Sequence, residues 1–302
     1  MNPTACAGCA TPLPAAADAC PGCSAPVGRQ LRTWVSPSAW VTAVEWVDGI
    51  RVVKMLKDLD AQGNCARLRR EAEALAGLSG RVPPGSVPEV LASGRGVVVT
   101  RFVPGVSVQR VLSRRNVDRA LPVMAAGRAV AALHAADLLG PRSRSEPGGL
   151  IPNLEAVEDL FPAWLLEAAV SAGDERAAHP VLVHGDCVPS NWLWDGERVC
   201  LLDFAQLRFG SPEFDPALAW ARLRLLGGGL RNEVGRRLSS IVLEPPWPAT
   251  SARWLANGLV IIAWYDRVRF AAARRGLREL REAALRVRVR EVVRELAERR
   301  GD

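Results

Sequence analysis

The chain has 302 residues, enough for two or three structural units with buried cores. Its hydrophobic content of 49% and charged content of 24% fit a soluble globular protein and exclude a disordered chain. No segment resembles a signal peptide, and the longest apolar run, residues 259–264, is too short to span a bilayer. We therefore expect a cytoplasmic protein without a membrane partner, whose seven cysteines favour metal binding over disulfides.

Four of these cysteines lie near the N-terminus in two close pairs. The spacing is C-x2-C, ten residues, C-x2-C, made by Cys6, Cys9, Cys20 and Cys23. Two such knuckles offer four thiolates in tetrahedral geometry, so the pattern predicts a zinc ribbon over residues 1–28. The Ala- and Pro-rich run between the pairs cannot bury a core, so Zn²⁺ must supply its folding energy. A disordered tail and an iron–sulfur or redox site are the alternatives. A four-thiolate site is closed, which favours structural support or contact with a protein partner over catalysis.

The next region reads as a small sheet with one helix. We expect strands at residues 31–35, 40–47 and 50–56, with Asp48-Gly49 turning the chain between the second and third. Asn64 can cap a helix whose apolar residues recur at helical spacing: Leu68, Ala72, Leu75 and Leu78. Residues 87–91 hold at most a short strand, and residues 97–103 form the last strand.

The second half of the chain is predicted to be mostly helical. Helices are expected at residues 117–139 and 159–172, and more follow after residue 211. The last one, residues 276–298, carries an apolar stripe of Leu285, Val289, Val292 and Leu296.

Polar residues that could carry chemistry gather in residues 183–206, VHGDCVPSNWLWDGERVCLLDFAQ. Asp186 follows His184-Gly185, Asn191 comes five positions later, and Asp203 twelve positions after that. Asp195-Gly196 favours a tight hairpin, which would bring Asn191 and Asp203 together, with Asp186 close by. Two carboxylates and an amide oxygen suit Mg²⁺. The segment therefore predicts phosphoryl transfer, with one Asp taking the proton of an acceptor hydroxyl while Asn and the second Asp hold the metal.

This segment resembles the catalytic core of the aminoglycoside phosphotransferases and their relatives, small-molecule kinases with a protein-kinase-like fold. The shared pattern is HGD, four residues, N, a hairpin, then D. Protein kinases have Arg where this chain has Gly185, and Gly where it has Ala205. The resemblance implies an α+β, bilobal fold with a β-rich lobe over residues 29–103 and a helical lobe over residues 104–302, preceded by the zinc ribbon. It makes Asp186 the catalytic base and Asn191 and Asp203 the Mg²⁺ ligands.

Further site residues follow from the same resemblance. Lys54, one of only two lysines, stands where the family has its phosphate-binding Lys. Glu71 matches the helix Glu that pairs with that Lys, with Glu73 as its competitor. The hinge that meets adenine is assigned to Thr100, Phe102 and Val103. The loop over residues 36–40 contains no Gly, unlike the phosphate-covering loop of protein kinases.

Three polar residues are implied to support the site rather than to react. His134 ends the Ala-rich helix in a Leu-His context, where the family has a structural histidine. His184 orders the catalytic loop. Asp215 matches the Asp that holds that loop through hydrogen bonds.

Positive charge is concentrated at the C-terminal end. Residues 211–302 hold 18 Arg and 11 Asp or Glu, an excess equal to the net charge of +7 of the whole chain. This makes a polycationic aminoglycoside a poor acceptor, although Glu155, Glu158, Asp159 or Asp266 could line a pocket. A solvated Arg-rich helix face explains most of the excess. Nucleic-acid binding by the zinc ribbon and the basic C-terminus is the alternative.

We predict a Mg·ATP-dependent phosphotransferase that moves the γ-phosphate to a hydroxyl of a small molecule. A serine/threonine protein kinase is one alternative. The Gly-free loop and the stretch of fifty residues from His134 to His184 argue against it. The other alternative is a non-catalytic nucleotide-binding scaffold that acts through the zinc ribbon and the basic C-terminus.

Overall fold

The computed structural model describes residues 4–5, 11–13, 29–35, 39–46, 48–58, 64–114, 118–136, 153–175, 177–226, 230–271 and 275–301. The chain forms two compact units. The sheet unit comprises Met1–Gly105 and Cys200–Leu207, and the helical unit comprises Val106–Val199 and Arg208–Asp302. The chain therefore leaves the first unit at Gly105 and returns to it for eight residues, which include Asp203.

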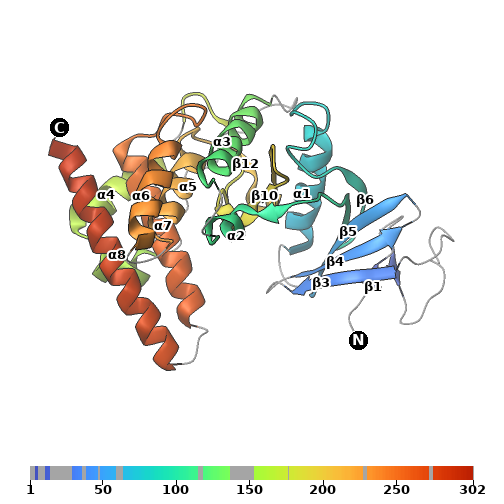
Figure 1. Cartoon of the computed structure of the whole chain (residues 1–302), viewed down its shortest axis with the longest axis horizontal. Coiled ribbons are helices and arrows are strands. Elements are labelled where there is room, and N and C mark those ends of the chain that lie inside the picture. Colours follow the sequence, from blue (N-terminus) through green and yellow to red (C-terminus); the bar gives the residue numbers. More distant parts are fainter. Residues whose placement is uncertain are drawn as a thin grey trace. The chain divides into compact units, whose positions relative to one another are not determined.

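The sheet unit is built on a five-stranded antiparallel sheet with the order β3-β4-β5-β7-β6. Helix α1 packs against β6 and β7 (Figure 1). The elements are β3 (Arg29–Val35), β4 (Ala39–Trp46), β5 (Gly49–Leu56), α1 (Asn64–Leu78), β6 (Val90–Gly94) and β7 (Val97–Arg101). A short pair, β1 (Thr4–Ala5) and β2 (Pro12–Leu13), precedes them.

Alternation along the strands gives this sheet two apolar faces. Val97 and Val99 lie in one cluster with Val53, whereas Val98 lies in another with Leu68 of α1. Successive strand residues point to opposite faces, so the run of three valines can pack on both sides. Helix α1 covers the second face because its apolar residues recur at helical spacing.

The returning segment is fixed against the same unit. Strand β11 (Val199–Leu201) leads into the short helix η4 (Phe204–Gln206), which packs against α1. The backbone N–H of Leu201 donates to the carbonyl oxygen of Ser86 at 2.8 Å. These contacts hold Asp203 against the sheet unit.

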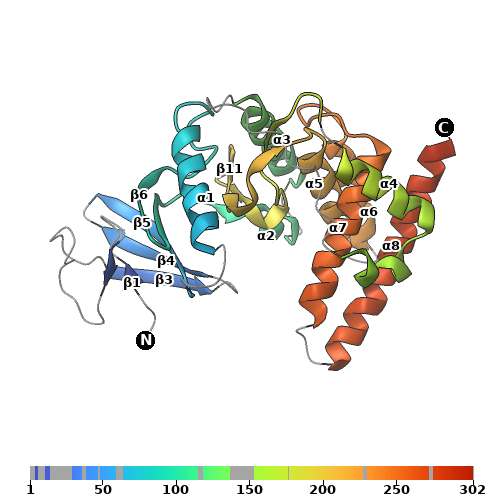
Figure 2. The same ribbon diagram turned by 180° about the vertical axis from the view of Figure 1, so that it is seen from behind.

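The helical unit is organised around α7, which packs against α4, α5 and α8 (Figure 2). Three of its tryptophans, Trp192, Trp220 and Trp254, are fully buried. The helices are α2 (Val108–Leu112), α3 (Ala120–Ala135), η1 (Leu154–Ala156), η2 (Glu158–Leu160), α4 (Ala163–Asp174), η3 (Pro189–Asn191), α5 (Phe214–Arg224), α6 (Leu230–Val242), α7 (Ala252–Ala271) and α8 (Arg275–Gly301). The strands are β8 (Val106–Ser107), β9 (Val181–Val183), β10 (Trp192–Trp194) and β12 (Arg208–Gly210).

Most predicted elements are confirmed, including the three-stranded start, α1 and the last helix with its buried stripe. Several boundaries differ, and the last strand of the sheet unit, predicted at residues 97–103, is β7, which ends at Arg101. The predicted helix 117–139 is the shorter α3, and the strand expected at residues 87–91 is β6, which begins at Val90. The helical stretch 159–172 is broken in two, because Pro162 has an extended backbone and precedes the first residue of α4.

The predicted zinc ligands Cys6, Cys9, Cys20 and Cys23 lie outside the described residues. Within the part of the chain that the structure describes, no helix is both long enough and apolar enough to cross a membrane.

Candidate active site

An ion cluster forms around Lys54 in the sheet unit. Lys54 lies on β5 between Val41 and Val98 of the neighbouring strands. Its ammonium Nζ donates to Glu71 Oε2 at 2.8 Å and to Asp203 Oδ1 at 2.9 Å. The ion pair expected between Lys54 and Glu71 is therefore present. Glu73 instead contacts Arg69, 3.6 Å away on the same helix.

The three charges of this cluster affect one another. Burial favours the neutral amine of Lys54, but the carboxylates of Glu71 and Asp203 outweigh it, so the pKa of Lys54 is raised. Burial also raises the pKa of Glu71, more than the neighbouring ammonium lowers it. Lys54 is therefore a cation at neutral pH. With one ammonium and two carboxylates, the cluster has a formal net charge of one negative unit.

Asp203 has an unusual backbone conformation. Its φ angle is +63°, and among the described residues it is the only one other than glycine with a positive φ. An Asp in the left-handed region carries backbone strain, and such strain is concentrated at functional sites. The side chain is half-exposed, so part of the carboxylate can accept another ligand besides Lys54.

The predicted hinge residues differ in whether the backbone N–H group already has a hydrogen-bond acceptor. Thr100 pairs with Val52 and Val90 in the sheet. The N–H of Phe102 donates to the carbonyl of Ile50 at 3.0 Å, so it cannot also bind adenine. The N–H of Val103 has no backbone partner within the described chain. Of the three, Val103 is therefore the residue for which the predicted contact with adenine is retained, and that contact stays a prediction.

A buried carboxylate holds the HGD loop in the helical unit. Asp215, in the first turn of α5, is fully buried. Its oxygens accept hydrogen bonds from the backbone N–H of His184 at 2.8 Å and of Gly185 at 3.0 Å, and from His134 Nε2 at 2.9 Å. One carboxylate thus fixes two successive amides just before Asp186.

The same contacts determine the ionisation of Asp215. Burial would raise the pKa of this carboxyl, but the hydrogen bond from His134 and the backbone donor at Gly185 outweigh burial and leave the pKa below its usual value. Asp215 is therefore a buried anion at neutral pH.

Asp186 and Asn191 contact each other across the loop. The side-chain amide Nδ2 of Asn191 donates to Asp186 Oδ2 at 2.9 Å and to the Asp186 carbonyl oxygen at 3.0 Å. Both hydrogens of the amide group are used in this way, so its oxygen is the group left for a cation. The backbone N–H of Asp186 donates to His184 Nδ1 at 3.2 Å, which orients the carboxylate further.

The turn that follows is closed as the sequence predicts. The N–H of Asp195 donates to the carbonyl of Arg198 at 3.3 Å, and Gly196 has a φ of +113° that favours glycine. Asp195 Oδ1 also accepts from the N–H groups of Glu197 and Arg198, both at 2.9 Å. From this turn the chain passes into β11 and reaches Asp203. Asp203 belongs to the sheet unit and Asn191 to the helical unit, so their expected proximity stays a prediction.

The sequence can be compared with known proteins. A family model described as "Phosphotransferase enzyme family" matches residues 41–252, more than two thirds of the chain. The chain belongs to this family. Membership makes the protein an ATP-dependent phosphotransferase that uses a hydroxyl group as acceptor. The matched range contains the Lys54 cluster and the loop with Asp186 and Asn191. It excludes the four N-terminal cysteines and all of α8.

Solved structures show the same kinase-like fold for this phosphotransferase. An aminoglycoside phosphotransferase from Streptomyces rimosus is 20% identical with a TM-score of 0.53, covering 76% of this chain and 91% of that chain. Amicoumacin kinase, solved in complex with AMP-PNP, Ca²⁺ and Ami, is 13% identical with a TM-score of 0.58, covering 87% of this chain and 88% of that chain. The protein APH(2")-IIa, solved in a ternary complex with streptomycin and ATP, is 16% identical with a TM-score of 0.52, covering 82% of this chain and 88% of that chain. A search of curated protein sequences gives no significant match.

Two carboxylates considered for an acceptor pocket of this phosphotransferase have other partners. Asp159 binds Arg267 and Arg286, which lower the pKa of its carboxyl, with Arg267 contributing most. Asp266 accepts from Arg222 at 2.6 Å. Both therefore tie helices together, which weakens the case that they face a cationic substrate.

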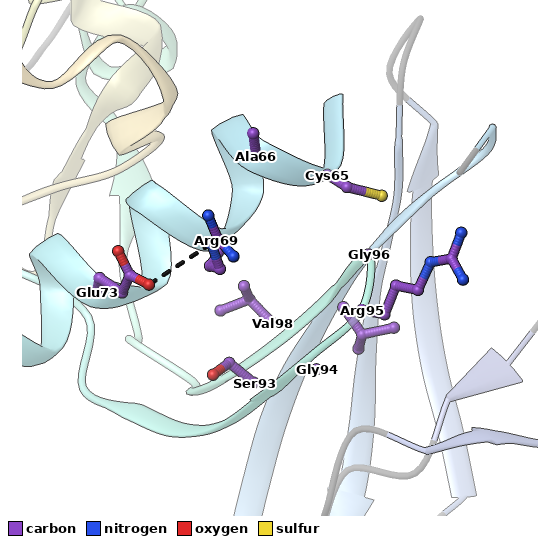
Figure 3. A pocket seen from close by; sticks show the side chains of 10 residues that line it. Cys65, Ala66, Arg69, Glu73, Ser93, Gly94, Arg95, Gly96 and Val98 are labelled. Atoms are coloured by element: carbon purple, nitrogen blue, oxygen red, sulfur yellow. Dashed lines mark ion pairs between the residues drawn. The ribbon is translucent and has the colours of Figure 1, made fainter. Parts of the chain in front are cut away.

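A hollow of about 520 Å³ lies in the sheet unit between α1 and the β6–β7 hairpin (Figure 3). Cys65, Arg69 and Glu73 line it from the helix, and Ser93 and Arg95 from the hairpin. The dashed line in Figure 3 marks the ion pair between Arg69 and Glu73. Glu73 thus neutralises Arg69, and Arg95 gives the lining of this hollow one more basic than acidic residue.

The sequence did not indicate the contact between Lys54 and Asp203. The two residues are 149 positions apart, and each had been assigned a separate role. The second missed contact is that of His134 with Asp215, 81 positions away. Each of these four residues was marked by its motif, but no local pattern indicated which pairs would touch.

Proposed function

We propose that this phosphotransferase transfers the γ-phosphate of Mg·ATP to a hydroxyl group of a small molecule in the cytoplasm, with Asp186 as the catalytic base. The observation that carries the proposal is the loop 184–191. There the buried Asp215 fixes the backbone before Asp186, and Asn191 holds the Asp186 carboxylate. A carboxylate oriented by a neighbouring amide and backed by a rigid loop suits proton removal from a bound hydroxyl.

Roles in nucleotide binding follow from the family resemblance and from the contacts within each unit. Lys54, oriented by Glu71, would bind the phosphates, and the backbone N–H of Val103 would meet adenine. The amide oxygen of Asn191 and the half-exposed carboxylate of Asp203 are hard oxygen donors suited to Mg²⁺. The metal, when bound, neutralises charge on the phosphates. The arrival of phosphates would also give Lys54 a third anionic partner, in competition with Asp203.

The chemical step then requires little covalent work from the protein. As the acceptor oxygen bonds to the γ-phosphorus, the bond from that phosphorus to the β–γ bridging oxygen breaks and ADP leaves. The proton of the acceptor hydroxyl passes to an oxygen of Asp186. Asn191 keeps that carboxylate pointed at the hydroxyl, and Lys54 offsets negative charge on the nucleotide.

Small-molecule kinases among the structural relatives support a small acceptor over a protein. The sequence adds the stretch of fifty residues between His134 and His184, in which α4 lies. Helices inserted there can build a pocket for a small substrate. The excess of Arg after residue 211 disfavours a polycationic acceptor.

We also propose that the N-terminal cysteines Cys6, Cys9, Cys20 and Cys23 bind one structural Zn²⁺ and offer a surface for a protein partner. The support comes from their spacing and from the strands beside the first pair. Thr4 pairs with Leu13 and Ala5 with Pro12, so the chain that carries Cys6 and Cys9 connects two antiparallel strands. A knuckle at the tip of such a ribbon is a common form of zinc site.

The first test compares the wild type with Asp186→Asn in transfer from γ-labelled ATP with Mg²⁺ and a small-metabolite extract. The substitution keeps the shape of the side chain and an oxygen for Asn191, so the fold should persist. We expect the rate of transfer to fall about a thousandfold or more, because the base is lost. Asp195→Asn, a matched change in the nearby turn, should keep full activity.

The distribution of label separates the proposal from its alternatives. Label in the small-molecule fraction with wild type alone supports the proposal and gives the product for identification. Label on protein alone would favour a protein kinase. Equal transfer by wild type and Asp186→Asn would refute the role of Asp186. Nucleotide binding without transfer by either form would favour a scaffold.

A further inference from the structure

The largest pocket described in the helical unit lies between α2 and α6, outside the loop that carries Asp186. Its volume is about 870 Å³, within the range of sites that bind small molecules. The residues that line it come from the start and end of α2, the N-terminal end of α3, the end of α5 and the middle of α6. They include Ser107, Arg110, Leu112, Arg119, Leu226 and Leu238.

One side of this pocket is apolar. Leu112 is the last residue of α2, Leu226 lies two residues beyond the end of α5, and Val234 and Leu238 are one turn apart on α6. Leu238 is only 4% exposed, and the other three are half-buried. Leucine and valine side chains at this position can cover a short hydrocarbon or aromatic body.

The charges that line the pocket are of one sign. Arg110 and Arg119 contribute two guanidinium groups, and no Asp or Glu is among the residues described as its lining. Arg110 makes no ion pair with any described residue. Arg119 donates through Nε at 3.0 Å, and through Nη2, to the carbonyl oxygen of Arg114, which is a neutral acceptor. Both positive charges are therefore uncompensated by carboxylates of the described chain.

The other two pockets differ in this respect. The hollow beside α1 contains the ion pair of Arg69 with Glu73. The pocket of about 390 Å³ between α6 and α8 is lined by three arginines and three glutamates, and Arg224 there binds Glu295. In each of these two pockets, one arginine of the lining is paired with a glutamate of the same lining. The α2–α6 pocket is the one whose described lining joins an apolar wall to unpaired positive charge.

We propose that the α2–α6 pocket binds a small amphipathic anion, a carboxylate or phosphate ester attached to an apolar body of several carbons. The anionic group would accept hydrogen bonds from Arg110 and from the free donors of Arg119. The apolar body would lie on Leu112, Val234 and Leu238. Ser107 and Gln109 add neutral donors to the lining. This inference stands independently of the kinase reaction, since it uses none of the residues assigned to that reaction.

The test is calorimetric titration of the full-length protein with octanoate and with octylammonium, which share one alkyl chain and differ in charge. We expect octanoate to bind one site with a dissociation constant on the order of 0.1–1 mM. Octylammonium should bind at least about tenfold more weakly, because its charge faces two arginines. Acetate, which lacks the chain, should not bind measurably.

Two variants of Arg110 tie the binding to this pocket. Arg110→Ala should weaken the binding of octanoate at least about tenfold, because a charge-assisted contact is lost. Arg110→Glu should shift the binding preference towards octylammonium. Arg110 is exposed, so both variants should fold, and their melting temperatures verify this. Arg128→Ala, an exposed arginine on α3 that does not line the pocket, is the control and should bind as wild type. Absence of saturable octanoate binding, equal affinity for both ligands, or unchanged affinity in both Arg110 variants would overturn the proposal.

Discussion

Individual residues of this phosphotransferase are held in place by buried charge. Asp215 accepts three hydrogen bonds with no exposed surface, and Lys54 is shared between two carboxylates. Such arrangements fix geometry well, because breaking one partner leaves the others unsatisfied. They also give each residue a distinct response to substitution.

Asp215→Asn tests the buried anion through pH. The lowered pKa of Asp215 means that its ionised form stabilises the fold above about pH 4, the unfolded value, and that this stabilisation is lost as the pH falls towards the folded value. At pH 7 the variant should lose roughly 3 kcal/mol in free energy of unfolding, since an amide cannot satisfy three donors. Urea titrations measure this. The gap between wild type and variant should shrink as the pH falls from 7 to 3, and a gap that stays constant would contradict the buried anion.

Lys54→Met tests the nucleotide contact, and the second lysine of the chain supplies the control. Methionine keeps much of the length and apolar stem of Lys54 but removes its charge, so kcat/KM for ATP should fall about a hundredfold. Glu71→Gln keeps the ammonium of Lys54 but removes the negative charge of its buried partner. In this variant kcat/KM for ATP should fall about tenfold. Lys57→Met should stay within about twofold of wild type, because Lys57 lies against the ring of Trp40, 4.9 Å from its centre, outside the ion cluster. A loss as large for Lys57 as for Lys54 would show that the effect is not specific.

The elements were predictable where they depend on local pattern. The strands up to Leu56, α1 with its buried apolar residues, and α8 with its stripe follow from periodicity and turn residues. The elements that differ depend on less local causes. Helix α3 is shorter than the Ala-rich run suggests. Strand β6 begins at Val90, the first residue that pairs with β7. The contacts within the candidate site, such as Lys54 with Asp203, come from tertiary packing that no periodicity records.

Close packing between α5 and α7 offers a test at the scale of elements. A Cβ added at Gly258 would lie 2.4 Å from the carbonyl oxygen of Ala217, so the two helices would have to separate. We expect Gly258→Ala to lower the free energy of unfolding by about 1–3 kcal/mol. It should also lower kcat, because α5 carries Asp215 at its start and so supports the loop of Asp186.

Gly276→Ala is the matched control for this change. Gly276 lies in α8, and a Cβ there would meet no atom within 4 Å. Alanine should therefore raise the free energy of unfolding by about 0.5–1 kcal/mol through helix propensity alone, with no change in kcat. Denaturant titration and transfer rates measure both variants. A Gly258→Ala protein as stable and as active as wild type would show that α5 and α7 tolerate separation.

At the scale of the whole molecule, several arginines of the basic C-terminal part join helices. Arg222, Arg224, Arg267 and Arg286 all bind carboxylates within the helical unit. These pairs connect α5, α7, α8 and η2, so part of the basic C-terminal half is used to join helices. The sequence showed the charge but could not show which arginines have partners. The two that line the α2–α6 pocket, Arg110 and Arg119, form no ion pair with a described carboxylate.

The N-terminal cysteines provide the last prediction, and it concerns a part of the chain that the family match does not reach. Purified protein should contain about one Zn²⁺ per chain, and Co²⁺ substituted for it should show the thiolate absorption of a tetrahedral four-sulfur site. Cys20→Ser should lose the metal, whereas Cys65→Ser should retain it, because Cys65 lies on α1. Phosphate transfer should persist in Cys20→Ser, since the residues assigned to the reaction lie elsewhere. Metal-free wild type purified without chelators, or metal retained by Cys20→Ser, would refute the zinc ribbon. Loss of transfer together with the metal would instead show that the ribbon supports the kinase fold.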